Sequence, residues 1–478
     1  MKKKDDVVAK TNFIKKELSN IDEYLTLKEA AHLFNKTISN ISYLIQYDRI
    51  NRYNSKGEKI KKAKNGGLRV SKKELITYFS ERKEFLQNRM KQLSITDMTL
   101  AFIDVPERER TKHVHRIHPY LGKFIPQLVE HFLTRFFKPN QIVIDPFCGS
   151  GTTLVQACEN GLHSIGIDIS EFNTLISKVK LADYDLEILD KEVLDIMNKT
   201  IDWSSSYFDK NAVSFIDNKL TTDSEYLKTW FAERSLKEIL YFNHLIKDYQ
   251  YKNLLRVILS RTIRSCRLVH HYDLASPKNP VIEPYQCYKH KNKICTPVKT
   301  ISPRLKFYSN DTIRRIRKFK EIRVKNCDSI VIEADSQTVN LDQTRAKKLL
   351  KKHTVGGIFT SPPYVGQIDY HEQHRYAYEL FGFTRRDKLE IGPKFDGKSQ
   401  IAQKKYIEGI SAVFKNISEY TPSSALWFIV ANDKLSLYPT IFEKSGLKII
   451  KTYNRPVEDR TERDKRPYSE NVFMVKKT

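Results

Sequence analysis

The sequence predicts an α/β protein in which a mostly parallel sheet of seven strands carries a long insertion and follows a small, separate helical module. Three observations predict this architecture. From about residue 114 onward, short apolar runs typical of buried strands alternate with helical segments. A glycine-rich turn joins the first of these runs to a helix. Roughly 160 residues separate the second run from the third, far more than an ordinary crossover needs.

Residues 24–86 are expected to form the N-terminal module. Thr26 and Glu29 have the spacing of a capping box, which starts a first helix. Apolar residues at helical spacing over 38–45 predict a second helix. A basic stretch over 51–69, turned by a glycine pair, predicts a two-stranded wing, and a third helix closes the module. This order resembles the winged helix-turn-helix modules of the excisionase and MerR-like type.

The resemblance implies that this module binds duplex DNA, with its second helix in the major groove and its wing along the phosphates. The chain carries 83 basic and 57 acidic side chains, a formal net charge of +26, which favours a nucleic-acid partner. Two alternatives remain: that the module docks a protein, and that the excess of lysine is inherited from an AT-rich genome. The residues expected to contact DNA are Ser39, Asn40, Ser42, Tyr43 and Gln46 on the second helix, and Arg52, Lys61, Lys62 and Lys64 in the basic stretch.

Seven apolar runs mark the expected strands of the sheet. In chain order they are residues 142–144, 164–167, 329–332, 357–360, 426–430, 447–450 and 471–475. The stretch between the second and third strands is rich in helix formers and then in prolines, which predicts an inserted subdomain. The expected organisation is a tail over 1–23, the helix-turn-helix module over 24–86, a linker helix over 87–113, the first half of the sheet domain over 114–181, the insertion over 182–326 and the second half over 327–478.

The glycine-rich turn after the first strand is the strongest local signal. It has the sequence Asp145-Pro146-Phe147-Cys148-Gly149-Ser150-Gly151-Thr152-Thr153. Glycines allow the backbone to pass close to a ligand, and the helix that starts here favours a negative group at its N-terminus. The turn lacks the lysine of a phosphate-binding loop. Asp168, which ends the second strand, suits two ribose hydroxyls, so the two features together indicate a nucleoside-containing ligand.

A second signal, Ser361-Pro362-Pro363-Tyr364, stands at the end of the fourth strand, where parallel sheets bind their ligands. The two prolines fix an extended turn whose carbonyl can accept a hydrogen bond from the exocyclic amine of a base. The Ser361 hydroxyl can accept a second such bond, and the Tyr364 ring can stack on a base turned out of the duplex. We therefore expect these four residues to be catalytic.

Together the two motifs resemble those of the DNA amino-methyltransferases, and SPPY is similar to the motif of the cytosine-N4-specific type II modification methylases. The resemblance implies a Rossmann-like, seven-stranded methyltransferase sheet with S-adenosyl-L-methionine as its cofactor. The segment from His118 to Pro126 resembles the family's motif X, over the methionine end of the cofactor. The cofactor-binding residues that the resemblance implies are Tyr120, Lys123, Phe124, Asp145, Pro146, Phe147, Cys148, Gly149, Ser150, Gly151, Thr152, Asp168, Ile169, Asp335 and Ser336.

By this resemblance the chain is expected to methylate N4 of cytosine in double-stranded DNA, after flipping the base, and to act beside a cognate restriction endonuclease. Three alternatives stay open: N6-adenine methylation, guanine-N2 methylation in tRNA, and a catalytically inactive DNA-binding regulator. Enzymes that act on adenine more usually carry DPPY or NPPY. The sequence contains no Pro-Cys dipeptide, which argues against carbon-5 cytosine methylation, since that reaction needs a thiolate nucleophile.

The insertion is expected to supply target recognition. Arg261, Arg264 and Arg267 recur at a spacing of three, which predicts a basic helical face toward DNA, with a solvated face as the alternative. The basic loop over 384–405 is expected to close over the flipped base. The cysteines and histidines between residues 266 and 295 miss the CxxC spacings of zinc sites, so we expect no metal ion there.

Composition also excludes some classes of protein. The sequence has no run of about 18 apolar residues, as a transmembrane helix would need. Its charged N-terminus is not followed by the apolar segment of a signal peptide. Six scattered cysteines suit a reducing compartment. These features predict a cytoplasmic protein without a membrane partner.

Overall fold

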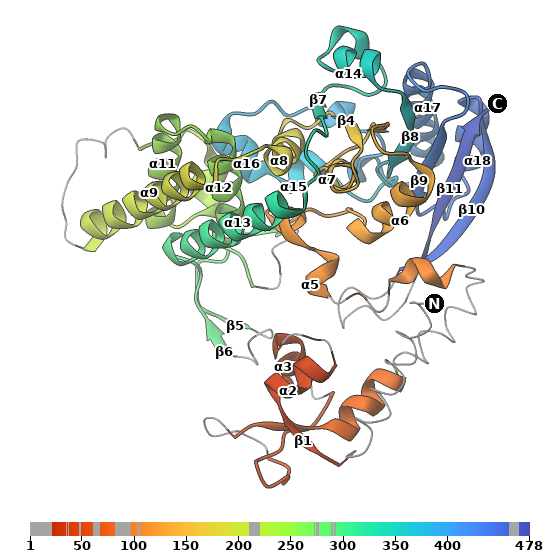
Figure 1. The fold of residues 1–478 in the computed structure, drawn as a ribbon. Coiled ribbons are helices and arrows are strands. Elements are labelled where there is room, and N and C mark those ends of the chain that lie inside the picture. Colours follow the sequence, from red (N-terminus) through yellow and green to blue (C-terminus); the bar gives the residue numbers. More distant parts are fainter. Residues whose placement is uncertain are drawn as a thin grey trace. The chain divides into compact units, whose positions relative to one another are not determined.

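The computed structural model describes residues 22–34, 36, 38–46, 49–60, 67–81, 97–102, 105, 107–209, 220–271, 273, 277–287, 290, 293–457 and 468–478. The chain divides into two compact units, whose helices and strands are labelled in Figure 1. The first unit comprises Met1–Glu109 with Pro456–Ser469, and the second comprises Arg110–Arg455 with Glu470–Thr478.

The first unit is built from short elements around a small core. The predicted capping box is confirmed: the Thr26 hydroxyl accepts a hydrogen bond from the Glu29 amide at 3.1 Å, and the Glu29 carboxylate accepts one from the Thr26 amide at 2.8 Å. Strands β1 and β2 pair antiparallel. The elements are β1 (Tyr24–Thr26), α2 (Leu27–Leu33), α3 (Ile38–Gln46), β2 (Arg69–Ser71) and a helical segment over 72–81.

The predicted wing appears in part. The described chain turns where the Asn54 amide donates to the Glu58 carbonyl at 2.9 Å, and Tyr53 pairs with Arg69 through two backbone hydrogen bonds. The strand that contains Arg69 continues into the pairing with β1. Gly66, at the predicted turn, lies outside the described residues. The basic stretch therefore has a turn earlier than the sequence predicted.

The linker helix predicted over 87–113 is wrong for its described part. That part contains two short helical turns, η1 (Met98–Ala101) and α5 (Glu107–Arg110), in place of one helix. Phe102 follows the first turn with a φ of 52°, a left-handed conformation that ends a helix. A further turn, η2 (His113–Arg116), leads into the second unit.

The second unit contains the predicted seven-stranded sheet, with the order β10-β11-β9-β8-β3-β4-β7. Neighbouring strands from β9 to β7 pair in parallel, whereas β11 is antiparallel to β9. Every strand contains the apolar run that predicted it, so the α/β class is confirmed. The strands are β3 (Ile142–Asp145), β4 (His163–Asp168), β7 (Ser329–Glu333), β8 (Val355–Thr360), β9 (Leu426–Ala431), β10 (Leu447–Val457) and β11 (Tyr468–Lys477).

Helices cover both faces of this sheet, because side chains alternate along each strand. Phe359 and Phe428 point to one face, where both rings contact Phe132 of α6. Ile358 and Trp427 point to the other face and share a core with α17 and α18. The helices and helical turns beside the sheet are α6 (Pro126–Phe136), α7 (Thr152–Glu159), α8 (Glu171–Leu181), η7 (Leu341–Gln343), α14 (Ala346–Lys352), α15 (Tyr370–Gln373), α16 (Arg375–Phe381), η8 (Asp387–Leu389), η9 (Lys394–Asp396), α17 (Gln400–Ser418) and α18 (Tyr438–Lys444).

The predicted insertion lies between β4 and β7 and is mostly helical. Its helices do not form a core of their own: buried side chains of α9, α11, α12 and α13 belong to one hydrophobic cluster with those of α7 and α8. Its elements are α9 (Leu186–Ser204), η3 (Ser205–Asp209), α10 (Glu225–Trp230), α11 (Glu233–Leu245), η5 (Ile246–Asp248), α12 (Lys252–Cys266), β5 (Tyr285–Cys287), β6 (Lys293–Cys295) and α13 (Ser302–Ile322). Among the described residues, every helix is too short or too polar to span a lipid bilayer.

Candidate active site

Two neighbouring strands bring the two predicted motifs together. β3 ends at Asp145, where the glycine loop begins, and β8 ends at Thr360, directly before Ser361. Because these strands pair in parallel, both motifs lie at the same edge of the sheet. The Thr360 hydroxyl donates to Asp145 Oδ1 at 2.6 Å, which ties the two strand ends to each other.

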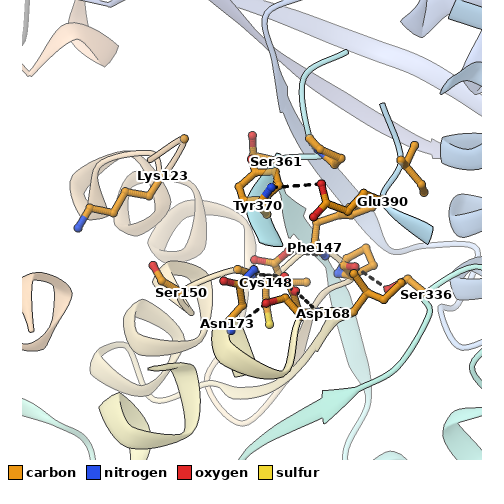
Figure 2. A pocket seen from close by; sticks show the side chains of 18 of the residues that line it. Lys123, Phe147, Cys148, Ser150, Asp168, Asn173, Ser336, Ser361, Tyr370 and Glu390 are labelled. Carbon is orange, nitrogen blue, oxygen red and sulfur yellow. Dashed lines mark hydrogen bonds between the residues drawn. The ribbon is translucent and has the colours of Figure 1, made fainter. Parts of the chain in front are cut away.

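Both motifs line one cavity, shown from close by in Figure 2. It contains about 870 Å³ of empty space, a figure that includes open solvent at its mouth. The predicted residues that line it are Tyr120, Lys123, Phe124, Asp145, Pro146, Phe147, Cys148, Gly149, Ser150, Thr152, Asp168, Ile169, Asp335, Ser336, Ser361 and Pro363. The predicted residues that are not part of its lining are Gly151, Pro362 and Tyr364.

The loop after β3 requires glycine at two positions. Gly149 and Gly151 have φ values of +48° and +76°, in the left-handed region that favours glycine. A Cβ atom on Gly149 would lie 2.8 Å from the Tyr120 hydroxyl, and one on Gly151 would lie 2.8 Å from the Ser177 hydroxyl. The Ser177 hydroxyl also donates to the Gly149 carbonyl at 2.8 Å. Gly151 therefore serves the shape of the loop, packed against α8, although it does not line the cavity.

Asp168 is held firmly at the end of β4. Its Oδ2 atom accepts from the Gly149 amide at 2.9 Å, and its Oδ1 atom accepts from the Ser170 amide at 2.8 Å and the Asn173 side chain at 3.1 Å. Burial raises the pKa of Asp168 to about 6, and burial raises the pKa of Asp145 to about 6 as well. At neutral pH both groups are therefore mostly ionised and face the cavity as hydrogen-bond acceptors.

Besides His371 Nε2, two buried polar atoms of the lining residues are unsatisfied. Within the described residues, Ser150 Oγ and Asn173 Oδ1 have no hydrogen-bond partner, although both side chains are only 2% exposed. Buried polar atoms are nearly always paired in folded proteins. The two atoms therefore mark positions where a bound ligand with polar groups would complete the site.

Hydrogen bonds to α17 and β11 hold the SPPY corner in place. The Pro363 carbonyl accepts from the Tyr406 hydroxyl of α17 at 2.9 Å, and the Tyr364 hydroxyl donates to Glu470 Oε1 of β11 at 3.0 Å. The Ser361 hydroxyl, by contrast, has no hydrogen-bond partner among the residues described. Ser361 and Tyr370 both line the cavity and are labelled in Figure 2. The corner thus holds one hydroxyl ready for a ligand on a rigid support.

The sequence did not predict several residues that line the cavity. They are Gly122, Ser170, Asn173, Tyr370, His371, Leu389, Glu390, Ile391 and Val413. Glu390 accepts from the backbone amides of Tyr370 and His371 at 3.2 and 2.9 Å, so the segment after SPPY and the loop over 384–405 meet there. A signal existed for Asn173, which comes five residues after Asp168 and lies in the first turn of α8. The pairing at Glu390 has no local sequence pattern.

Comparison with known proteins identifies the family. Residues 2–178 match a family model of the N6/N4 type that is described as DNA methylase. Type II methyltransferase M.MjaII from Methanocaldococcus jannaschii is 44% identical over 523 residues, an alignment that covers 94% of this chain and 96% of that protein. The chain belongs to the N6/N4 DNA methylase family. It is a DNA methyltransferase.

Two further relatives match the methylase over less of its length. Type II methyltransferase M.BsoBI from Geobacillus stearothermophilus is 26% identical over 327 residues, covering 63% of the methylase and 59% of that protein. Type II methyltransferase M.MvaI from Kocuria varians is also 26% identical, over 196 residues that cover 40% and 42% of the two chains.

The basic face that the sequence predicted on α12 of the methylase is wrong for two of its three arginines. Arg261 and Arg267 are only 6% and 4% exposed. Arg261 pairs with Asp311 of α13 at 2.8 Å, and the Arg267 guanidinium lies over the Tyr376 ring, 5.1 Å from its centroid. Arg264, between them, is half-buried. Arg261 thus packs against α13 within the insertion, and Arg267 packs against α16 outside it, so both side chains have buried structural partners.

The predicted DNA contacts of the N-terminal unit remain predictions. On α3, Asn40 is exposed and Ser42 is half-buried. Arg52 is half-buried and donates to the Ile45 carbonyl at 3.4 Å. The remaining predicted contacts fall outside what the structure describes: the side chains of Ser39, Tyr43 and Gln46, and the whole of Lys61, Lys62 and Lys64.

Proposed function

We propose that the methylase transfers a methyl group from S-adenosyl-L-methionine to N4 of a cytosine flipped out of duplex DNA. One observation carries the proposal: the glycine loop and Ser361 line the same cavity. A cofactor held on the loop and a base held against the SPPY corner would therefore face each other. Holding two reactants in this way supplies much of the rate enhancement of a transfer between them.

The lining fits S-adenosylmethionine. The ionised Asp168 suits the two ribose hydroxyls, and the unpaired atoms of Ser150 and Asn173 suit the polar ends of such a ligand. Phe147 and Ser336, also in the lining, provide the apolar and polar surface that an adenine ring needs. When bound, the cofactor supplies an electrophilic methyl group on a positively charged sulfur.

The SPPY corner fits an exocyclic amine. The amine carries two hydrogens, and two acceptors are proposed for them: the Ser361 hydroxyl oxygen and the Pro362 carbonyl. The Pro363 carbonyl is already engaged by Tyr406, which leaves the preceding carbonyl for the base. Two accepted bonds draw the amine out of conjugation with the ring, so its lone pair can attack a methyl group. The nitrogen then loses one proton to solvent.

The Tyr364 ring is proposed to stack on the extruded base. Its hydroxyl donates to Glu470, which holds the tip of the ring against β11. Base flipping is necessary because an amine inside the duplex is paired and cannot reach a cofactor in a cavity. A serine at position 361, where enzymes acting on adenine more usually have aspartate or asparagine, favours cytosine as the target.

Sequence recognition is assigned to the insertion and to the N-terminal unit. The net charge of +26 supports duplex DNA as the substrate. The relatives are named type II methyltransferases, which supports a role as the modification half of a restriction-modification system with a cognate endonuclease.

The decisive experiment is nucleoside mass spectrometry. Duplex DNA from a methylation-free host is incubated with the purified chain and S-adenosylmethionine, digested to nucleosides, and analysed for modified bases. We expect N4-methylcytosine. N6-methyladenine instead would assign the adenine specificity, and the absence of any modified DNA base would overturn the proposal.

A paired comparison controls for folding. Ser361→Ala and Pro362→Ala alter the corner after β8, whereas Pro422→Ala and Ser423→Ala alter an exposed Pro-Ser pair in the turn before β9. Only the first pair is expected to lower methylation. Equal activity in all four variants would contradict the assignment of the corner.

A further inference from the structure

Four potential metal ligands meet in the second half of the insertion, outside the active site. His271, Cys287, His290 and Cys295 each offer one ligand atom, and these four atoms lie within 4.8 Å of one another. The sequence predicted no metal here because the spacings miss CxxC. Folding supplies the proximity: His271 follows α12, and the two cysteines come from the paired strands β5 and β6.

The backbone places both thiols on one face of the β5–β6 hairpin. Cys287 is paired in register with Lys293, and Tyr285 with Cys295. Because partners in register share a face and every second residue of a strand shares a face, Cys287 and Cys295 point the same way. The Tyr285 hydroxyl accepts from the His271 amide at 3.0 Å, which brings the histidine to that face.

The distances between ligand atoms suit a tetrahedral zinc ion. Each histidine faces a thiol through Nδ1: His271 lies 3.8 Å from Cys287 Sγ, and His290 lies 3.1 Å from Cys295 Sγ. Zinc bonds of about 2.1 Å to nitrogen and 2.3 Å to sulfur place such atoms about 3.6 Å apart in a tetrahedron. Two nitrogen and two sulfur ligands are a donor set that zinc prefers among the divalent ions.

We propose that these four residues bind one zinc ion in a closed, structural site. Four protein ligands leave no open position for water or substrate, as a catalytic zinc would require. The proposal is independent of the base that the active site methylates.

The ion would fasten the hairpin to the helices. Strands of three residues are too short to be stable alone, and Figure 1 shows the β5–β6 hairpin projecting away from α12 and α13. Its outer face offers no burial to hold it, because Ile294 is 76% exposed. A zinc ion that joins both strands to His271 replaces the missing core, as metals do in other small elements.

The test is metal content of the full chain. Purified protein is dialysed against buffer without chelator, and zinc is measured per chain by plasma mass spectrometry. We expect close to one zinc per chain. A Cys287→Ser/Cys295→Ser double variant is expected to lose it. Cys327→Ser is the matched control, since Cys327 is a free, partly buried cysteine outside the cluster, and it is expected to keep the zinc.

Cobalt spectroscopy keeps the proposal testable if the double variant fails to fold. Co²⁺ added to metal-stripped wild-type protein is expected to give the visible bands of a tetrahedral site and a thiolate charge-transfer band, at one ion per chain. Wild-type protein that carries no zinc and gives no thiolate band with Co²⁺ would overturn the proposal. A Cys287–Cys295 disulfide found by mass spectrometry in freshly prepared protein would overturn it as well.

Discussion

The hydroxyl of Ser361 makes no hydrogen bond within the described residues, unlike polar atoms of Pro363 and Tyr364. Pro363 and Tyr364 are tied to α17 and β11, whereas the Ser361 hydroxyl faces the cavity without a partner among the described residues. A rigid corner with one available hydroxyl is what an acceptor for a base amine requires, because little reorganisation is left for the reaction itself.

We expect Ser361→Ala to lower kcat roughly 10²-fold, because the amine loses one acceptor that it needs in the transition state. The Kd for S-adenosylmethionine should be unchanged, since the glycine loop is intact. Steady-state kinetics and calorimetry separate the two effects. Ser423→Ala, exposed and far along the chain from the corner, is the control. A Ser361→Ala enzyme with the wild-type kcat would remove this residue from the mechanism.

The pH dependence of cofactor binding should follow Asp168. Burial raises the pKa of this carboxyl to about 6, above the usual 3.8, so lowering the pH through 6 protonates it in the folded protein. Below pH 6 the affinity for S-adenosylmethionine should fall, by up to about tenfold per pH unit, and above it the affinity should be flat. Calorimetry over a buffer series measures this. Asp168→Asn should bind weakly at every pH, and a variant with the wild-type profile would exclude Asp168 as the titrating group.

At the scale of elements, the loop after β3 shows how a ligand site depends on backbone conformation. Its glycines take left-handed φ values that place the loop against Tyr120 and Ser177. The shape is therefore set before any ligand arrives, and a side chain on Gly149 would have to displace the Tyr120 ring.

Gly149→Ala is expected to raise the Kd for S-adenosylmethionine at least tenfold, which corresponds to about 1.4 kcal/mol. The matched control is Gly446→Ala, because Gly446 has a similar φ of +65° with nothing within 4 Å of a new Cβ. That variant carries the backbone strain alone, so it should lose some thermal stability and keep its cofactor affinity. Equal affinities in the two variants would show that the contact with Tyr120 is irrelevant.

Arg261 of α12 forms a buried ion pair with Asp311 of α13. Arg261→Ala should lower the free energy of unfolding by about 3 kcal/mol, because it leaves the buried Asp311 carboxylate with less compensation. Arg314 contacts the same carboxylate but is 74% exposed, so Arg314→Ala should cost under about 1 kcal/mol. Urea unfolding measures both. A stable Arg261→Ala protein with weakened DNA binding would restore the DNA-facing role predicted from the sequence.

The same helix shows what a sequence can and cannot predict. Local patterns predicted the capping box at Thr26, all seven strands and both motifs, because hydrogen bonds and burial within a few residues determine them. The spacing of Arg261, Arg264 and Arg267 predicts one helical face, but only Arg261 and Arg264 lie on α12, and Arg267 follows its last residue in an extended conformation. The spacing does not show what packs on that face, since the partner Asp311 comes 50 residues after Arg261 in the chain.

Contacts between residues far apart in the sequence also explain why the sequence did not reveal other features of the structure. Glu390 enters the cavity by capping the backbone of Tyr370 and His371, and no periodicity links those positions. In the Cys/His cluster, too, the spacing in the sequence does not reveal that the fold brings four potential ligands together. The CxxC pattern describes ligands from one local turn. The four residues of this cluster come instead from the segment after α12 and from the β5–β6 hairpin.

For the whole molecule, charge gives the clearest prediction. A protein with a net charge of +26 that binds duplex DNA should displace counterions from the phosphates. The association constant should fall by about a thousandfold or more between roughly 50 and 200 mM salt, if about six or more phosphates are contacted. Fluorescence anisotropy with a labelled duplex measures the slope. Salt-independent binding would exclude this mode of DNA association.

The shared core of the insertion has a consequence for how such enzymes diversify. Val193 of α9 and Ile258 of α12 belong to the same cluster as Leu154 of α7, the helix that follows the glycine loop, and Ile176 of α8, whose next residue Ser177 contacts the loop. Transplanting this insertion from a relative would thus replace more than half of the buried side chains in this cluster, and steric mismatch there would reach the cavity. By reciprocity, a ligand bound in this cavity should protect these helices against proteolysis, and the cavity and the insertion should unfold in one melting event.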